Sequence, residues 1–153
     1  MTGPDSRARL VGINHVALEV GDVDAALDFY GDLFEFDLRG RTESAVFLDV
    51  GDQFLALSEA ETEGRDGHRH FGLVVDDPDA VEGRLADIDA EVLPTRGLDF
   101  RDPWGNRIQV VAYEEVQFTK ADHVLAGMDL PELSKSESAM AELAEKGMAS
   151  TSE

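Results

Sequence analysis

The chain of 153 residues has no cysteine, no long apolar run and only three lysines. The absence of cysteine excludes disulfides, thiolate metal ligands and a cysteine nucleophile. No apolar run approaches the roughly 20 residues of a membrane-spanning helix, and the first residues lack the apolar core of a secretory signal. We therefore expect one soluble, cytoplasmic domain over residues 1–153.

The charge of the sequence is one-sided. It has 33 acidic and 13 basic residues, which gives a formal net charge of −20. The acidic residues are spread over expected turns and helix faces, so one disordered acidic tail does not explain the charge. Such a surface repels nucleic acid and anionic membranes, and we expect neither as a partner. The composition resembles that of proteins from salt-loving organisms, which predicts a halophilic source.

The chain contains the same order of predicted elements twice. His15 matches His70, and Asp24-Ala25 matches Asp79-Ala80, each with an offset of 55 residues. Periodicity predicts a strand, a helix and three strands in residues 11–59, at 13–20, 23–34, 36–41, 45–50 and 53–58. It predicts the same order in residues 68–113, at 69–75, 78–88, 91–94, 98–101 and 107–112. The sequence therefore predicts an α+β fold of two tandem βαβββ modules.

The C-terminal extension, residues 114–153, matches neither module. The S-K-S-E sequence from Ser134 to Glu137 has the pattern of a capping box. It predicts a short helix, packed on the outside of the domain or at a subunit boundary. We expect the last five residues to be disordered.

The turn before the last predicted strand of the second module has a distinctive composition. Pro103 presets its backbone angle and Gly105-Asn106 tolerates positive φ, so D-P-W-G-N forms a sharp reversal. Gln109 then stands between apolar neighbours in the following strand. Its amide either lies at a polar rim or points into a cavity as a ligand.

The paired modules, the H-V-A-L strand at His15, Phe29-Tyr30 in the first helix and the D-P-W-G-N turn together resemble the vicinal oxygen chelate superfamily. That superfamily groups glyoxalases, bleomycin-resistance proteins and extradiol dioxygenases. The resemblance covers residues 13–112. It implies that each module curls its strands into half of a barrel around a cavity.

The resemblance also implies a set of metal-ligand positions. They fall at His15, His70 and Gln109, where the superfamily usually has Glu in the third place; the fourth falls at Leu55 or Ala56, neither of which binds metal. Two imidazoles and a carboxylate suit divalent Fe, Mn, Zn or Ni. The uncharged amide of Gln109 should weaken the binding, and no organic cofactor is expected. The alternative is that the histidines are remnants of a lost metal site.

Two functions follow from the resemblance. The first is a small metalloenzyme with isomerase or lyase chemistry on a small molecule with vicinal oxygens, with Glu19 as the base. Phe47, Phe54 and Phe100 are expected in the core or lining the pocket. The second is a metal-free small-molecule-binding protein of the bleomycin-resistance type. In both cases we expect a homodimer.

The net charge predicts that stability depends strongly on salt. Repulsion between exposed charges extends about 30 Å at 0.01 M salt and about 3 Å at 1 M. The melting temperature should therefore rise steeply over the first few hundred millimolar KCl. Further stabilisation in sulfate would come from strengthened apolar burial. A melting temperature that is flat or falling between low salt and 1 M KCl would contradict a salt-adapted surface.

Overall fold

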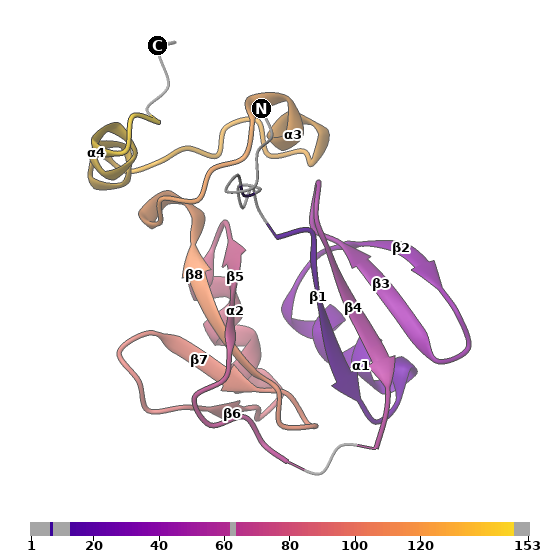
Figure 1. Cartoon of the computed structure of the whole chain (residues 1–153). Coiled ribbons are helices and arrows are strands. Elements are labelled where there is room, and N and C mark those ends of the chain that lie inside the picture. Colours follow the sequence, from indigo (N-terminus) through magenta and orange to yellow (C-terminus); the bar gives the residue numbers. More distant parts are fainter. Residues whose placement is uncertain (1–6, 8–12, 62–63, 149–153) are drawn as a thin grey trace.

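The computed structural model describes residue 7 and residues 13–61 and 64–148. Each module forms one four-stranded sheet, and Figure 1 shows the two sheets side by side. The first module contains β1 (His15–Val20), α1 (Val23–Leu33), β2 (Asp37–Arg41), β3 (Ala45–Asp49) and β4 (Phe54–Glu59). The second contains β5 (Phe71–Val75), α2 (Pro78–Asp87), β6 (Glu91–Val92), β7 (Leu98–Arg101) and β8 (Arg107–Ala112). The predicted α+β class and the repeated order of elements are confirmed.

The two sheets have equivalent strand orders, β1-β4-β3-β2 and β5-β8-β7-β6. The first and last strands of each module pair in parallel, and the other neighbours are antiparallel. Most predicted boundaries agree within a residue or two. The strand predicted from residue 69 begins two residues later, at Phe71, so His70 lies just before it.

Each helix begins at an aspartate, as the sequence indicates. The carboxylate of Asp22 accepts the amide of Ala25 at 2.9 Å, and that of Asp77 accepts the amide of Ala80 at 3.3 Å. A carboxylate at this position satisfies one of the free N–H groups of the first turn and favours the positive end of the helix dipole. The caps therefore fix where each helix begins after the first strand of its module.

One core joins the modules. α1 and α2 contact each other, and the ring of Phe100 in β7 lies 6.0 Å from Phe29 and 6.4 Å from Phe34 of the first module. The buried cluster includes members from both modules: Leu18, Val20, Tyr30, Leu33, Val46, Leu48, Leu55, Leu57, Val81, Leu85, Ile108 and Val110. Because both helix-covered faces contribute to this core, the modules form one unit.

The turn between β7 and β8 fastens the second module to the first. Asp102 is 2 % exposed, and its Oδ1 accepts the backbone amides of Trp104 and Asn106 at 3.0 and 2.9 Å. Its Oδ2 accepts the Tyr30 hydroxyl from α1 and the Asn106 side chain, both at 2.8 Å. The same Asn106 amide donates to the carbonyl of Glu19 at the end of β1.

Trp104 makes this junction tight. A Cβ atom at Gly21 would lie 2.5 Å from the indole Nε1 of Trp104. No real Cβ makes so short a contact, so the close approach of the turn requires glycine at this position. The relative placement of the two sheets therefore depends on the Asp102 turn.

Strands β1 and β5 run in opposite directions in Figure 1, β1 downward from the N-terminal side and β5 upward. Their beginnings, at His15 and next to His70, therefore lie at opposite ends of the two sheets. This arrangement decides which candidate residues a single chain can bring together.

The C-terminal extension runs over the end of the molecule where β1 begins (Figure 1). It contains a 3-10 turn, η1 (Tyr113–Glu115), and two helices, α3 (Asp122–Gly127) and α4 (Glu137–Glu145). The prediction of a helix here is confirmed, but the cap is Ser136, whose hydroxyl accepts the amide of Ala139 at 3.2 Å, and not Ser134. The predicted disordered end lies outside the described residues.

Among the described residues, no helix combines the length and apolar character that crossing a bilayer requires.

Removing the hydroxyl of Tyr30 tests how strongly the turn holds the modules. We expect Tyr30→Phe to lower the free energy of unfolding by roughly 1.5–3 kcal/mol, the range for a buried hydrogen bond to a charged group. Urea unfolding measures this. A change below about 0.5 kcal/mol, the range of ordinary surface substitutions, would contradict the role of this contact.

The buried hydroxyl of Tyr30 also predicts that the protein loses stability at alkaline pH. Burial, followed by the charge of Asp102, raises the pKa of Tyr30 well above its usual value. Unfolded Tyr loses its proton near pH 10, so the stabilisation is complete below about pH 10 and is lost as the pH rises further. Urea midpoints should fall more steeply above pH 10 in the wild type than in Tyr30→Phe. Equal slopes would contradict the assignment.

Candidate functional site

The face of the first sheet away from the core carries the predicted residues of that module. His15, Ala17 and Glu19 alternate with more buried neighbours along β1, which confirms that they share one face. In the parallel pairing with β4, His15 is opposite Phe54 and Ala17 is opposite Ala56. We call this surface, and its counterpart on the second sheet, the open faces.

His15 is held in a defined orientation. Its Nδ1 lies 2.8 Å from the side-chain oxygen of Asn14, and its ring stacks on Phe54 with centroids 4.6 Å apart and planes 9° apart. With an oxygen acceptor at Nδ1, the neutral imidazole carries its proton on Nδ1 and has the Nε2 lone pair available. His15 is thus prepared to bind an electrophile through Nε2.

Aromatic and charged side chains surround this histidine. Phe47 lies edge-on to Phe54 with centroids 6.1 Å apart, and Arg39 lies 4.7 Å above the Phe54 ring. Arg39 also contacts Asp49 at 3.5 Å. The first open face therefore has an aromatic centre and a charged rim, which suits a small polar molecule.

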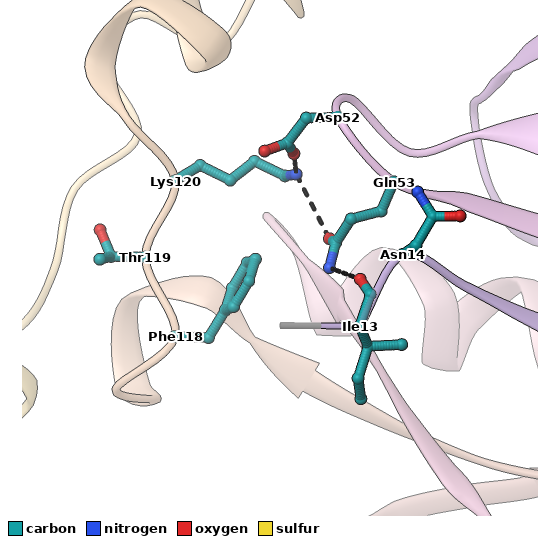
Figure 2. Close-up of a pocket in the computed structure, with 7 residues that line it drawn as sticks. All are labelled: Ile13, Asn14, Asp52, Gln53, Phe118, Thr119 and Lys120. Carbon is teal, nitrogen blue, oxygen red and sulfur yellow. Dashed lines mark hydrogen bonds and ion pairs between the residues drawn. The ribbon is translucent and has the colours of Figure 1, made fainter. Parts of the chain in front are cut away.

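A cavity of about 380 Å³ lies beside the start of β1. Figure 2 shows that Phe118 and Lys120 of the C-terminal extension face Gln53 and Ile13 of the first module. Lys120 contacts Asp52, and this hydrogen bond is the main cause that lowers the pKa of the Asp52 carboxyl. Asn14, the partner of His15, also lines the cavity.

His70 is oriented in the same manner as His15. Its Nδ1 lies 2.7 Å from the backbone carbonyl of His68. Because a carbonyl oxygen can only accept, Nδ1 carries the proton and Nε2 is free to bind a ligand. Metal-binding histidines commonly have this second hydrogen bond, which fixes both tautomer and ring orientation.

Gln109 lies on the same open face as His70. It pairs with Gly72 of β5, two residues after His70, and with Asp99 of β7. A Cβ atom at Gly97 would lie 3.2 Å from Gln109 Nε2 and 3.6 Å from Asp99 Oδ1. The second module therefore brings Gln109, His70 and the carboxylate of Asp99 to one face.

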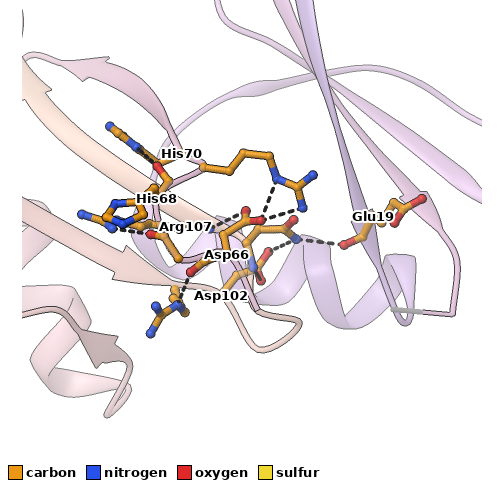
Figure 3. Close-up of polar contacts among 10 residues, drawn as sticks. Glu19, Asp66, His68, His70, Asp102 and Arg107 are labelled. Carbon is orange, nitrogen blue, oxygen red and sulfur yellow. Dashed lines mark hydrogen bonds and ion pairs between the residues drawn. The ribbon is translucent and has the colours of Figure 1, made fainter. Parts of the chain in front are cut away.

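Residues 64–70, which lie between the two modules, are bound to the second module. The Asp66 amide donates to the carbonyl of Gly105 at 2.9 Å, and its carboxylate accepts from Arg69 at 2.8 Å and from the Arg107 amide at 3.2 Å. Figure 3 shows this network beside His68 and His70, with Glu19 at its far side. The network fixes the backbone that supplies the partner of His70.

Sequence reasoning missed the ion pair of Asp99 and Arg107. Asp99 is 2 % exposed and accepts from Arg107 at 2.8 and 3.1 Å. Asp99 alternates with Leu98 and Phe100, and this alternation in the sequence could have placed it on the open face. The ion pair places the carboxylate of Asp99, neutralised by Arg107, next to Gln109.

The other predicted residues take different places. Ala56, in the position equivalent to Gln109, faces the open side, whereas Leu55 is 4 % exposed in the core. Phe47 and Phe54 are half-buried at the open face. Phe100 is fully buried between the modules, so it is a core residue and does not line this surface.

One chain brings His70 and Gln109 together but not His15, since β1 and β5 begin at opposite ends of the sheets. Glu19 lies four residues from His15, about 13 Å along the strand, and cannot bind the same ion. Among the described residues, no group of three or more His, Asp or Glu side chains is arranged to hold a metal. Convergence of His15, His70 and Gln109 on one ion remains a prediction for the assembled protein.

A family model matches residues 12–110, the span of both modules, with the description Glyoxalase/Bleomycin resistance protein/Dioxygenase superfamily. The chain belongs to this superfamily. It is 28% identical over 114 residues to the metallothiol transferase FosB of Shouchella clausii, covering 65% of this chain and 78% of the relative. It is 26% identical over 97 residues to FosB of Staphylococcus haemolyticus, covering 60% and 70%.

Solved structures of this superfamily share the fold. Fosfomycin resistance protein FosX from Listeria monocytogenes, in complex with Mn(II) and sulfate, has a TM-score of 0.60 at 15% identity and covers 78% of this chain and 99% of its own. FosX from Mesorhizobium loti has a TM-score of 0.57 at 17% identity, with coverages of 67% and 92%. The C-terminal extension lies beyond the region that the superfamily model matches.

Proposed function

We propose that this protein is a divalent-metal-dependent enzyme of the isomerase or lyase type, acting on a small molecule with two adjacent oxygens. One observation carries the proposal: both symmetric histidines, His15 and His70, have Nδ1 fixed by an oxygen acceptor and Nε2 free on an open face. A remnant histidine without a ligand role does not require this arrangement twice.

The donor set fits a divalent ion. His15, His70 and Gln109 would supply two imidazole nitrogens and one amide oxygen, which suit Fe, Mn, Zn or Ni. When bound, the ion would act as a Lewis acid that chelates both substrate oxygens and stabilises negative charge on them. The amide of Gln109 carries no charge, so we expect weaker binding than a carboxylate would give.

The relatives support a metal-dependent function. The curated relatives are named metallothiol transferases, and FosX was solved with Mn(II). A variant of FosX was solved with Mn(II) and 1S,2S-dihydroxypropylphosphonic acid, a molecule with adjacent hydroxyl groups. We carry over the class of ligand, a small molecule with vicinal oxygens, and not the identity of the substrate.

We further propose that the working form is a homodimer in which each site uses both chains. His15 begins β1 and His70 precedes β5, at opposite ends of the two sheets of one chain, so an ion at His15 needs a second source of His70 and Gln109. A second copy of the chain, related by a two-fold axis, would supply these two residues, and the same contacts would form the second site. Val74, on the open face with His70, is a 37 % exposed apolar residue that such pairing would cover.

The remaining residues have roles toward the substrate. Phe47 and Phe54 would pack against its carbon skeleton. Glu19, exposed on the open face of β1, is the proposed base. Asn14, Asp66 and His68 are positioning residues, since they act through the histidines.

The second candidate is a metal-free binding protein. The neutral Gln109 and the absence of a ligand at Ala56 favour it. Elemental analysis of protein purified without a His-tag separates the candidates, because only the metalloenzyme retains a stoichiometric divalent ion.

The sharpest test of the ligand role is Gln109→Glu. A carboxylate at this position should tighten the binding of Mn(II) or Zn(II) on the order of 10-fold, the size of effect that changes around metal sites produce. Titration calorimetry measures it. The control is Gln117→Glu, which adds the same charge at a residue that contacts Lys146 in the extension. Unchanged or weaker binding by Gln109→Glu, or equal gains in both variants, would contradict the proposal.

A further inference from the structure

We propose that Lys120, in the C-terminal extension, is a positioning residue for His15. The extension lies beyond the residues that the superfamily model matches, and in this chain it supports one half of the proposed metal site. The inference rests on the proposed function, because it assigns a role to the orientation of His15.

Lys120 is a buried cation in a chain with only three lysines. Its side chain is 9% exposed, and its ammonium contacts the Asp52 carboxylate and lies 3.4 Å from Gln53 Oε1. Burying an ammonium is costly unless such partners satisfy it. Lys120 therefore fixes the positions of Asp52 and Gln53 in the turn between β3 and β4.

This turn leads directly to His15. Gln53 Nε2 donates to the carbonyl of Ile13 at 2.8 Å, and the Phe54 amide donates to the carbonyl of Asn14 at 3.1 Å. Asn14 holds Nδ1 of His15, and Phe54 stacks on its ring. Phe54 follows Gln53 in the chain. Asn14 follows Ile13, whose carbonyl accepts the hydrogen bond from Gln53 (Figure 2).

Lys120 is itself held by the second module. Tyr113, 4 % exposed at the end of β8, bonds to the hydroxyl of Thr119 at 2.9 Å and accepts the amide of Lys120 at 3.1 Å. The ammonium of Lys135 lies 3.7 Å above the Tyr113 ring and donates to the carbonyls of Tyr113 and Val116, both at 2.6 Å. The extension therefore connects the end of β8 to the start of β1.

The C-terminal extension packs closely against the turn between β3 and β4. Gly51 has φ +84°, and a Cβ atom there would lie 2.6 Å from Met128 Sδ and 3.0 Å from Lys120 Nζ. The extension fills the space over the turn, so the turn cannot move without moving Lys120. A lysine that only contributed an ion pair at the surface would leave His15 unaffected when removed.

The experiment compares full-length wild type with Lys120→Met, which keeps an apolar stem and removes the ammonium. The readout is the tautomer of each histidine, from long-range ¹H–¹⁵N correlation in metal-free protein near pH 8, where imidazole is neutral. We expect the Nδ1–H tautomer for His15 and His70 in the wild type. In Lys120→Met the signals of His15 should shift toward a mixture of tautomers while those of His70 stay unchanged.

Two further variants make the test specific. Lys146→Met removes the same charge from the extension at an exposed residue, and should leave both histidines unchanged. Gln53→Leu breaks the next contact toward Ile13 and should reproduce the effect on His15; it carries the test if Lys120→Met does not fold. The affinity for Mn(II) or Zn(II) should fall about 10-fold in Lys120→Met, as is typical for residues that orient metal ligands.

Unchanged His15 signals in folded Lys120→Met, or equal shifts in His15 and His70, would overturn the positioning role. A wild type that binds no metal would overturn the proposed function instead. In that case a selective shift of His15 would still establish that Lys120 positions the ring.

Discussion

The buried carboxylate of Asp102 is the contact on which the arrangement of the two modules depends. It accepts four hydrogen bonds, two from its own turn backbone, one from Asn106 and one from Tyr30 of the other module. An uncompensated buried charge would be strongly unfavourable, and the Tyr30 hydroxyl of α1 completes the set of hydrogen bonds that compensates it. In the docked arrangement β1 and β5 run in opposite directions (Figure 1), which separates His15 from His70 within one chain.

The chemistry of the open faces follows from a second constraint, the protonation of two imidazoles. A carbonyl at His70 and an amide oxygen at His15 place the proton on Nδ1 and leave Nε2 as the donor atom. The groups behind these acceptors differ between the modules. The Asp66 segment supports His70, whereas the turn at Asp52 and the C-terminal extension support His15. The pseudo-symmetric fold thus has two unrelated supports for two equivalent ligands.

Much of the fold could be predicted because local signals agreed with it. Alternation along β1, aspartate caps at Asp22 and Asp77, and the repeat at an offset of 55 residues each reflect backbone physics that acts within one module.

The site was less predictable. The support for His70 comes from Asp66, in a segment whose composition is typical of a linker, and no local pattern indicates that it binds Gly105 and Arg107. Phe100 was expected in the core or lining the pocket, and its packing against Phe29 and Phe34 decides for the core. Lys120 acts on a turn 68 residues earlier in the chain, which no sequence periodicity reveals.

A mixing experiment tests most directly the claim that the site is completed across subunits. His15→Ala and His70→Ala each remove one ligand from every site and should bind divalent metal weakly on their own. If the chains share sites, co-refolding equal amounts should regenerate intact sites, each with His15 from one chain and His70 from the other, to about a quarter of the wild-type stoichiometry. Calorimetry with Mn(II) or Zn(II) counts them. Wild-type protein that binds metal while the mixture recovers no tight site would contradict the shared site.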